Sequence, residues 1–268
     1  MNVEIVPATA VRPSTYNPRR ADEERLGMVE LSLRKLGWLL PIYADANGEI
    51  LSGHQRHYVA TERLGWDRVP VYRTKAMDLA KRKGLNIAFN RGTNDMARTD
   101  TPADLTTAIA ESNVNALGAA LSDCPPGRRF RCAEATDVPV HDLLARNTFA
   151  ANTYARGMAR LFASEGIVMP LIIAPDLAVV NGIGRLAHAA ASGAASVPCV
   201  RIEEPEVEFA RAMLNLLTMD FDIHRRYARE LRYNAFRRSR LRRRRLGRGF
   251  VFAVAGPGDL DITDPRHA

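Results

Sequence analysis

The stretch Gly53-His54-Gln55-Arg56 combines residue types that can bind an anion. It follows the apolar pair Ile50-Leu51 and precedes residues typical of a helix, so we expect a strand that turns directly into a helix at Gly53. The first N–H groups of a helix have no acceptor within the helix, and a glycine lets a ligand approach them closely. The stretch therefore predicts a phosphate-binding loop, with an ordinary strand-to-helix turn as the alternative.

Two histidines of this region lie three residues apart on the expected helix. The spacing of His54 and His57 fits a metal ion, but no nearby acid or cysteine completes a ligand set, so no metal site is predicted. We interpret His54 as a phosphate contact or a general acid/base, which makes it the candidate catalytic residue. His57 is expected to face solvent.

A second feature with chemical meaning is a basic segment near the C-terminus. Residues 225–248 hold twelve arginines and one acidic residue, Glu230, for a local charge of +11. Because the whole chain carries +8, the remainder carries −3. Arginines pair with phosphates and release counterions from nucleic acids, so the segment predicts contact with DNA. A solvated helix face, or contact with an acidic surface of another subunit, is the alternative.

The arginines of this segment that we expect to contact DNA share one stretch that has no helix breaker. They are Arg225, Arg226, Arg229, Arg232, Arg237, Arg238, Arg240, Arg242, Arg243, Arg244 and Arg245.

The elements that position the glycine loop can be predicted from short apolar runs and turn residues. In order, we expect a strand at 2–6, a helix at 21–36, strands at 39–44 and 49–52 joined by an Asn47-Gly48 turn, a helix at 55–64, a strand through 69–71 and a helix at 77–90. This order predicts a mixed α/β (α+β) fold around a small sheet.

The same pattern occurs twice in the chain. Gly37, Pro41, Gly53 and Arg56 each have an identical residue 129 positions later, and Pro70 matches a proline at an offset of 128. We therefore expect two tandem units and a basic C-terminal helix. The predicted domains are 1–100, a helical linker at 101–132, a second unit at 133–222, and an arginine-rich helix and tail at 223–268.

Composition sets the broad class of the protein. With 46% hydrophobic and 25% charged residues in 268, the chain has the composition of a globular protein, which excludes collagen-like and wholly disordered chains. No apolar run is long enough to cross a bilayer, and no secretion signal is expected. Three widely spaced cysteines favour a reducing cytoplasm over a disulfide framework.

Residues 3–100 resemble the ParB/sulfiredoxin superfamily. The landmarks appear in the family's order: an Asn17-Pro18-Arg19-Arg20 box, Pro41-Ile42, the Gly53-x-x-Arg56 loop, Leu64-Gly65 and Val69-Pro70-Val71. The resemblance implies that the chain binds a nucleoside triphosphate, CTP or ATP, together with Mg²⁺. It implies a binding set made of Arg19, Arg20, Gly53, His54, Gln55, Arg56, Asn90 and Arg91.

Three departures separate the chain from well-known branches of that superfamily. His54 stands where sulfiredoxins have a cysteine, so sulfinic-acid reduction is not expected. A second copy of the unit takes the place of a helix-turn-helix DNA reader. Phe89 stands where partitioning proteins carry an acid. In the second copy the arginine box has become Asn147-Thr148-Phe149-Ala150, which predicts a degenerate nucleotide site.

These features leave several functions open. The first is a ParB-like nucleotide-binding protein, with possible NTPase activity, that contacts DNA through the arginine-rich segment. The second is a phosphotransferase acting on a small-molecule hydroxyl or a modified DNA base. A ParB-like nuclease ranks lower because no Asp/Glu/His cluster suits two-metal hydrolysis. A nonenzymatic DNA-packaging protein with vestigial sites is the fourth.

Overall fold

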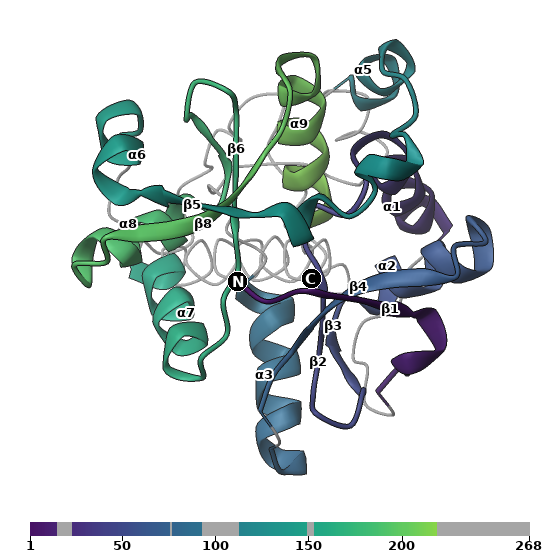
Figure 1. Cartoon of the computed structure of the whole chain (residues 1–268), viewed down its shortest axis with the longest axis horizontal. Coiled ribbons are helices and arrows are strands. Elements are labelled where there is room, and N and C mark those ends of the chain that lie inside the picture. The colour runs from purple at the N-terminus through teal and green to yellow at the C-terminus, as the bar shows by residue number, and fades with distance from the viewer. Residues whose placement is uncertain (15–22, 76, 93–112, 149–152, 219–268) are drawn as a thin grey trace, which may run out of the picture. The chain divides into compact units, whose positions relative to one another are not determined.

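The computed structural model describes residues 1–14, 23–75, 77–92, 113–148 and 153–218 (Figure 1). Residues 1–219 form one compact unit, which contains nearly all of both predicted repeats. The arginine-rich segment, with the basic C-terminal helix expected there, lies outside the described residues, as do residues 101–112 of the predicted helical linker. None of the helices in the described part of the chain is long and apolar enough to span a membrane.

The first repeat is built on a four-stranded mixed sheet with the order β1-β4-β2-β3 (Figure 1). Its strands are β1 (Glu4–Pro7), β2 (Ile42–Ala44), β3 (Ile50–Ser52) and β4 (Arg68–Arg73). β2 runs parallel to β4, whereas β1 and β3 pair antiparallel with β4 and β2. The strand expected from residue 39 begins only at Ile42, directly after Pro41, which has no N–H to donate to a ladder.

The helices of the first repeat follow the expected order. They are α1 (Glu23–Leu36), α2 (His54–Tyr58), which continues into a π-helical turn (Val59–Arg63), and α3 (Leu79–Gly92). α1 ends at Gly37, whose φ of +67° is the left-handed conformation expected at a glycine cap. The expected helix at 55–64 is therefore present as two joined helical turns.

The second repeat contains the same kind of sheet, with the order β5-β8-β6-β7. Its strands are β5 (Thr136–Pro139), β6 (Leu171–Ile173), β7 (Val179–Asn181) and β8 (Ser196–Arg201). Its helices are α6 (Val140–Arg146), α7 (Thr153–Ser164), α8 (Ile183–Ala191) and α9 (Val207–Thr218).

The two sheets agree in register as well as in strand order. Ile42 pairs with Val71 across the parallel strands of the first sheet, and Leu171 pairs with Cys199 in the second, at offsets of 129 and 128 residues. Both β2–β3 and β6–β7 change register at the equivalent residue, between Tyr43 and Ala44 in the first sheet. The prediction of two tandem units of mixed α/β fold is confirmed.

A connecting segment that contains α5 (Val114–Ala120) lies between the repeats and packs on the first. The Trp38 N–H donates to the Arg129 carbonyl, and the Arg129 guanidinium lies 4.6 Å from the centre of the Trp66 ring. Cys132 N–H returns a hydrogen bond to the Trp38 carbonyl. The domain boundaries remain predictions, because residues 93–112 and those after 218 are not described.

One hydrophobic cluster is shared by the two repeats. Phe89 of α3 stacks on Phe162 of α7, with ring centroids 4.7 Å apart, and lies 5.0 Å from the ring of Tyr43. The Tyr43 hydroxyl donates to the carbonyl of Val168, and a salt bridge joins Lys81 of α3 to a glutamate after α7. α3 is therefore packed against both halves of the compact unit.

Candidate functional site

The Gly53 loop, residues 53–56, comprises the glycine that follows β3 and the first turn of α2, so the strand turns directly into a helix as the sequence predicts. Gly53 has a φ of +102°, and a Cβ placed on it would lie 3.3 Å from the Ile42 Cα. Only a glycine takes this conformation without strain. The first helical hydrogen bond runs from the His57 N–H to the Gly53 carbonyl. The N–H groups of residues 54–56 therefore precede the helical ladder and suit an anion.

Gln55 gives a second sign of a ligand at this loop. Its amide nitrogen is buried, and no described residue accepts a hydrogen bond from it. A buried donor without a partner costs about 1–3 kcal/mol, so a ligand that supplied an acceptor here would remove this cost. Its place on the first turn of α2, beside three backbone donors, fits a phosphate oxygen as the missing acceptor.

Arg56 makes a contact that the sequence did not predict, and its expected contact with a phosphate stays a prediction. One terminal nitrogen of its guanidinium donates to the Leu40 carbonyl, and the other lies 3.3 Å from the position of a Cβ on Gly53. Burial lowers the pKa of Arg56. The guanidinium therefore connects the loop to the segment just before β2.

His54 accepts a hydrogen bond from the backbone of Ser14, which precedes the arginine box in the sequence. The Ser14 N–H donates to His54 Nε2 at 3.3 Å, which leaves the ring proton on Nδ1. Burial lowers the pKa of His54 to about 4, and the charge of His57 contributes in the same direction. His54 is thus neutral at pH 7, and its role as a general acid/base stays a prediction.

The expectation that His57 faces solvent is wrong. Its Nε2 donates to the Ala8 carbonyl at 3.0 Å, so the ring fastens α2 to the segment after β1. The contact joins residues 49 positions apart in the chain, which no local pattern reveals.

The buried, neutral His54 makes stability depend on pH in a calculable way. Below pH 6.5 the unfolded chain binds a proton at this histidine, but the folded chain does not until about pH 4, so stability falls as the pH drops through this window. The loss is about 2 kcal/mol between pH 7 and pH 5.

Urea unfolding of the wild type and of His54→Gln at both pH values checks this. The variant is expected to lack this part of the acid loss. The exposed His141 provides the control, because His141→Gln should behave as the wild type does. An acid loss as large in His54→Gln as in the wild type would contradict the assignment.

The remaining residues of the implied nucleotide site are placed only in part. Asn90 and Arg91 lie in the last turn of α3. Arg19 and Arg20 lie outside the described residues, in the gap between Ser14 and α1. The arginines expected to contact DNA, Arg225 to Arg245, also lie outside them.

The equivalent loop of the second repeat, residues 182–185, has the same backbone but fewer donors. Gly182 has a φ of +105°, and Arg185 donates to the Pro170 carbonyl, much as Arg56 donates to Leu40. Here, however, the Arg185 N–H already donates to the Gly182 carbonyl, and Gly184 stands in the position of Gln55. The glycine and arginine thus have a structural role in both repeats, while the extra donors belong to the first.

Comparisons with known proteins place the chain in a family. No family model matches it. Over 65 residues it is 35% identical to the ParB-like nuclease domain-containing protein YnaK of Escherichia coli strain K12, and the match covers 24% of this chain and 74% of that protein. The chain belongs to the ParB-like family.

Other ParB-like relatives match a smaller part of their own length. The nucleoid occlusion protein of Bacillus cereus strain B4264 is 34% identical over 73 residues, and the match covers 25% of each protein. A crystal structure of the truncated partitioning protein ParB from Caulobacter crescentus, complexed with CTP-γ-S, aligns to 62% of this chain and 86% of its own, with a TM-score of 0.32 and 19% identity.

The departure of this ParB-like chain at residue 89 has a structural reason. Phe89 is 1% exposed and fills the cluster between α3 and α7, so its side chain is part of the core that joins the repeats. The described residues contain no group of three or more His, Cys, Asp or Glu side chains that fits a metal ion.

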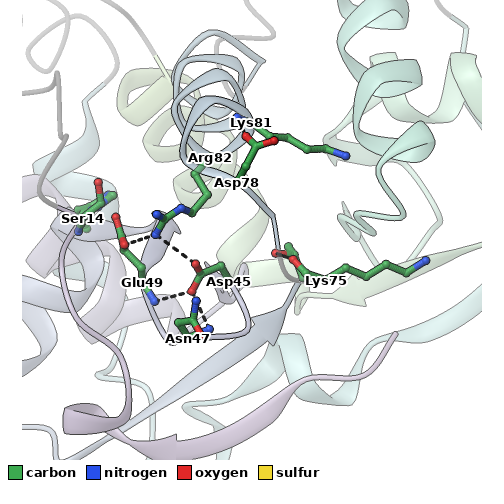
Figure 2. Close-up of polar contacts among 10 residues, drawn as sticks. Ser14, Asp45, Asn47, Glu49, Lys75, Asp78, Lys81 and Arg82 are labelled. Atoms are coloured by element: carbon green, nitrogen blue, oxygen red, sulfur yellow. Dashed lines mark hydrogen bonds and ion pairs between the residues drawn. The ribbon is translucent and has the colours of Figure 1, made fainter.

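Sequence reasoning missed one polar cluster of the ParB-like unit, which consists of Asp45, Glu49 and Arg82. Figure 2 shows Arg82 of α3 pointing toward both carboxylates at the β2–β3 turn. Its guanidinium donates to the Glu49 carboxylate and lies 3.4 Å from Asp45 Oδ2. The acids flank the Asn47-Gly48 turn, but their partner is more than 30 residues away, so the pattern of the turn gives no sign of it.

Proposed function

We propose that this protein binds a nucleoside triphosphate at the Gly53 loop and contacts DNA through its arginine-rich segment. The observation that carries the first part is the buried Gln55 amide without a partner among the described residues, set beside the first N–H groups of α2. A polyphosphate would supply acceptors for all of these donors, and the resemblance implies that Arg19 and Arg20 of the arginine box supply positive charge.

The nucleotide is proposed to bind the first repeat alone. The second loop has lost the glutamine, has one N–H engaged within the loop, and lacks the arginine box. We further propose that the two repeats arose by tandem duplication and that the second kept its fold after losing its site. CTP and ATP are the candidate nucleotides, and Mg²⁺ is expected only as the ion that the nucleotide brings.

The proposal concerns binding. Hydrolysis of the nucleotide, or its use by a kinase-like transfer to a hydroxyl, remains a sequence-based prediction with His54 as the candidate residue. A cytoplasmic location is proposed from cysteine usage, and all three cysteines are free thiols in the structure. DNA binding is proposed from the charge of residues 225–248, and the affinity is expected to depend strongly on salt.

Two variants separate nucleotide binding from DNA binding. Gly53→Ala introduces a methyl group 3.3 Å from the Ile42 Cα at a φ of +102°, so calorimetric titration with CTP, ATP and GTP should show at least a tenfold weaker affinity than in the wild type. Deletion of residues 225–248 should abolish salt-dependent DNA binding and leave nucleotide affinity intact.

The control is Gly65→Ala, which has a similar positive φ of +62° but nothing within 4 Å of the added Cβ. It should bind nucleotide as the wild type does. Absence of binding of all three nucleotides by the wild type would overturn the nucleotide part. Unchanged DNA affinity after the deletion would overturn the DNA part.

A further inference from the structure

The Asp45–Glu49–Arg82 cluster is built into the hairpin that leads to the Gly53 loop. Asp45 is 1% exposed, and its Oδ1 accepts the N–H groups of Asn47 and Glu49 at 2.9 and 2.8 Å (Figure 2). Its second oxygen, Oδ2, faces Arg82. One oxygen of the Asp45 carboxylate therefore stabilises the turn, and the other contacts α3 through Arg82.

Arg82 joins this turn to α3 from the helix side. It lies in the first turn of α3, and its single Nη1 contacts both Asp45 and Glu49. The side chains of Arg82 and Glu49 are 22% and 16% exposed, so the ion pairs are largely removed from water. Charge-assisted hydrogen bonds of this kind are directional and fix the orientation of the groups they join.

The cluster joins the hairpin that leads to the Gly53 loop to the helix that carries Asn90 and Arg91. Glu49 immediately precedes β3, and Gly53 directly follows its last residue, Ser52. On the other side, α3 continues from Arg82 for two turns to Asn90 and Arg91. The position of these two residues relative to the Gly53 loop therefore depends on how α3 is held on the hairpin.

The second repeat shows that this fold does not require the cluster. The residues equivalent to Asp45 and Glu49 are Ala174 and Ala178, and the equivalent of Arg82 is Arg211, which is exposed on α9. The sheet nevertheless forms with the same strand order and register. Buried ion pairs contribute little net stability compared with apolar residues, so their presence in the repeat with the intact loop points to a role other than folding.

We propose that Arg82 is a positioning residue for nucleotide binding: by bridging Asp45 and Glu49 it holds α3, and with it Asn90 and Arg91, in register with the Gly53 loop. This inference rests on the proposed function. It assigns a role in nucleotide binding to Asp45, Glu49 and Arg82, which act on the Gly53 loop indirectly, through the hairpin and α3.

The test measures nucleotide affinity and fold separately in the full chain. Arg82→Met removes the bridge, and calorimetry with CTP and ATP should show about a tenfold loss of affinity. Arg82→Lys keeps a positive charge at the site and should recover most of the nucleotide affinity that Arg82→Met loses. Arg211→Met, at the equivalent position of the second repeat, is the matched control and should bind as the wild type does.

Arg82→Met leaves Asp45 buried without its cation, which can prevent folding. The triple variant Arg82→Met, Asp45→Asn, Glu49→Gln removes all three charges together. Its circular dichroism spectrum should match that of the wild type, and it should still bind nucleotide about tenfold more weakly than the wild type does. Wild-type affinity in this folded variant would overturn the inference and leave the proposed function standing. A wild type that binds no nucleotide would overturn both.

Discussion

Replacing Arg131 by methionine is expected to lower the free energy of unfolding by about 3–5 kcal/mol. Arg131 is 4% exposed and donates from both terminal nitrogens to the two carboxylate oxygens of Glu206, each at 2.6 Å. One of these oxygens also accepts the Glu203 N–H at 2.8 Å. Removal of the guanidinium leaves a buried carboxylate that has lost its cation, and such a group is costly to bury.

The physical role of the pair is to fasten the connecting segment to the start of α9. Arg131 precedes Cys132, whose backbone N–H donates a hydrogen bond to the Trp38 carbonyl of the first repeat, while Glu206 directly precedes α9. Burial alone would raise the pKa of Glu206, but the hydrogen bonds from Arg131 and the Glu203 N–H hold it below its ordinary value. The stability contributed by this carboxylate is therefore present above about pH 4.5 and is lost as the pH falls further.

Urea unfolding at pH 7 measures the effect, and the double variant Arg131→Met, Glu206→Leu is the control. Because the double variant replaces both charged side chains by apolar ones, its free energy of unfolding should be much closer to that of the wild type than the value for the single variant. A single variant within 1 kcal/mol of the wild type would show that the ion pair is not buried in solution.

Phe89→Ala should destabilise the protein by about 3–5 kcal/mol. The side chain is almost fully buried and stacks on Phe162 from the other repeat, so its removal leaves a cavity where α3 meets α7. Phe89→Glu, which restores the acid typical of partitioning proteins, should be at least as damaging because it buries a charge in this cluster.

A double-mutant cycle with Phe162→Ala measures the contact itself. The stacked pair should show a coupling free energy of about 0.5–1.5 kcal/mol. Tyr58→Ala, at a ring that is 47% exposed, serves as the comparison and should have a small effect. Independent, additive effects of Phe89→Ala and Phe162→Ala would mean that the repeats do not share this core.

Local patterns were sufficient to predict most of the fold. Short apolar runs, an Asn47-Gly48 turn and glycine caps are short-range signals that predict the strands of three to six residues and the helix ends. The identical residues at an offset of 129 predict the same elements in the second repeat. The glycine loop was placed correctly for the same reason, since a strand, a glycine and a helix follow one another in the chain.

Contacts across the fold could not be predicted in this way. Arg56 was predicted to contact a phosphate, but its residue type gives no sign that one terminal nitrogen donates to the Leu40 carbonyl, which comes within reach only when β2 and α2 pack together. The Arg131–Glu206 pair joins residues 75 positions apart. Such contacts depend on the packed arrangement and leave no periodic mark in the sequence, so charge and residue type alone do not distinguish them from solvated groups.

The most direct test of nucleotide binding by the first repeat is a titration of the isotope-labelled full chain with Mg-CTP and Mg-ATP, followed by the NMR shifts of backbone amides. We expect the N–H signals of His54, Gln55 and Arg56 to move with one or both nucleotides, and the Gln55 side-chain amide with them. Those of residues 183–185 should stay in place. Movement confined to residues 183–185, or no movement in either loop, would contradict the assignment of the phosphate site.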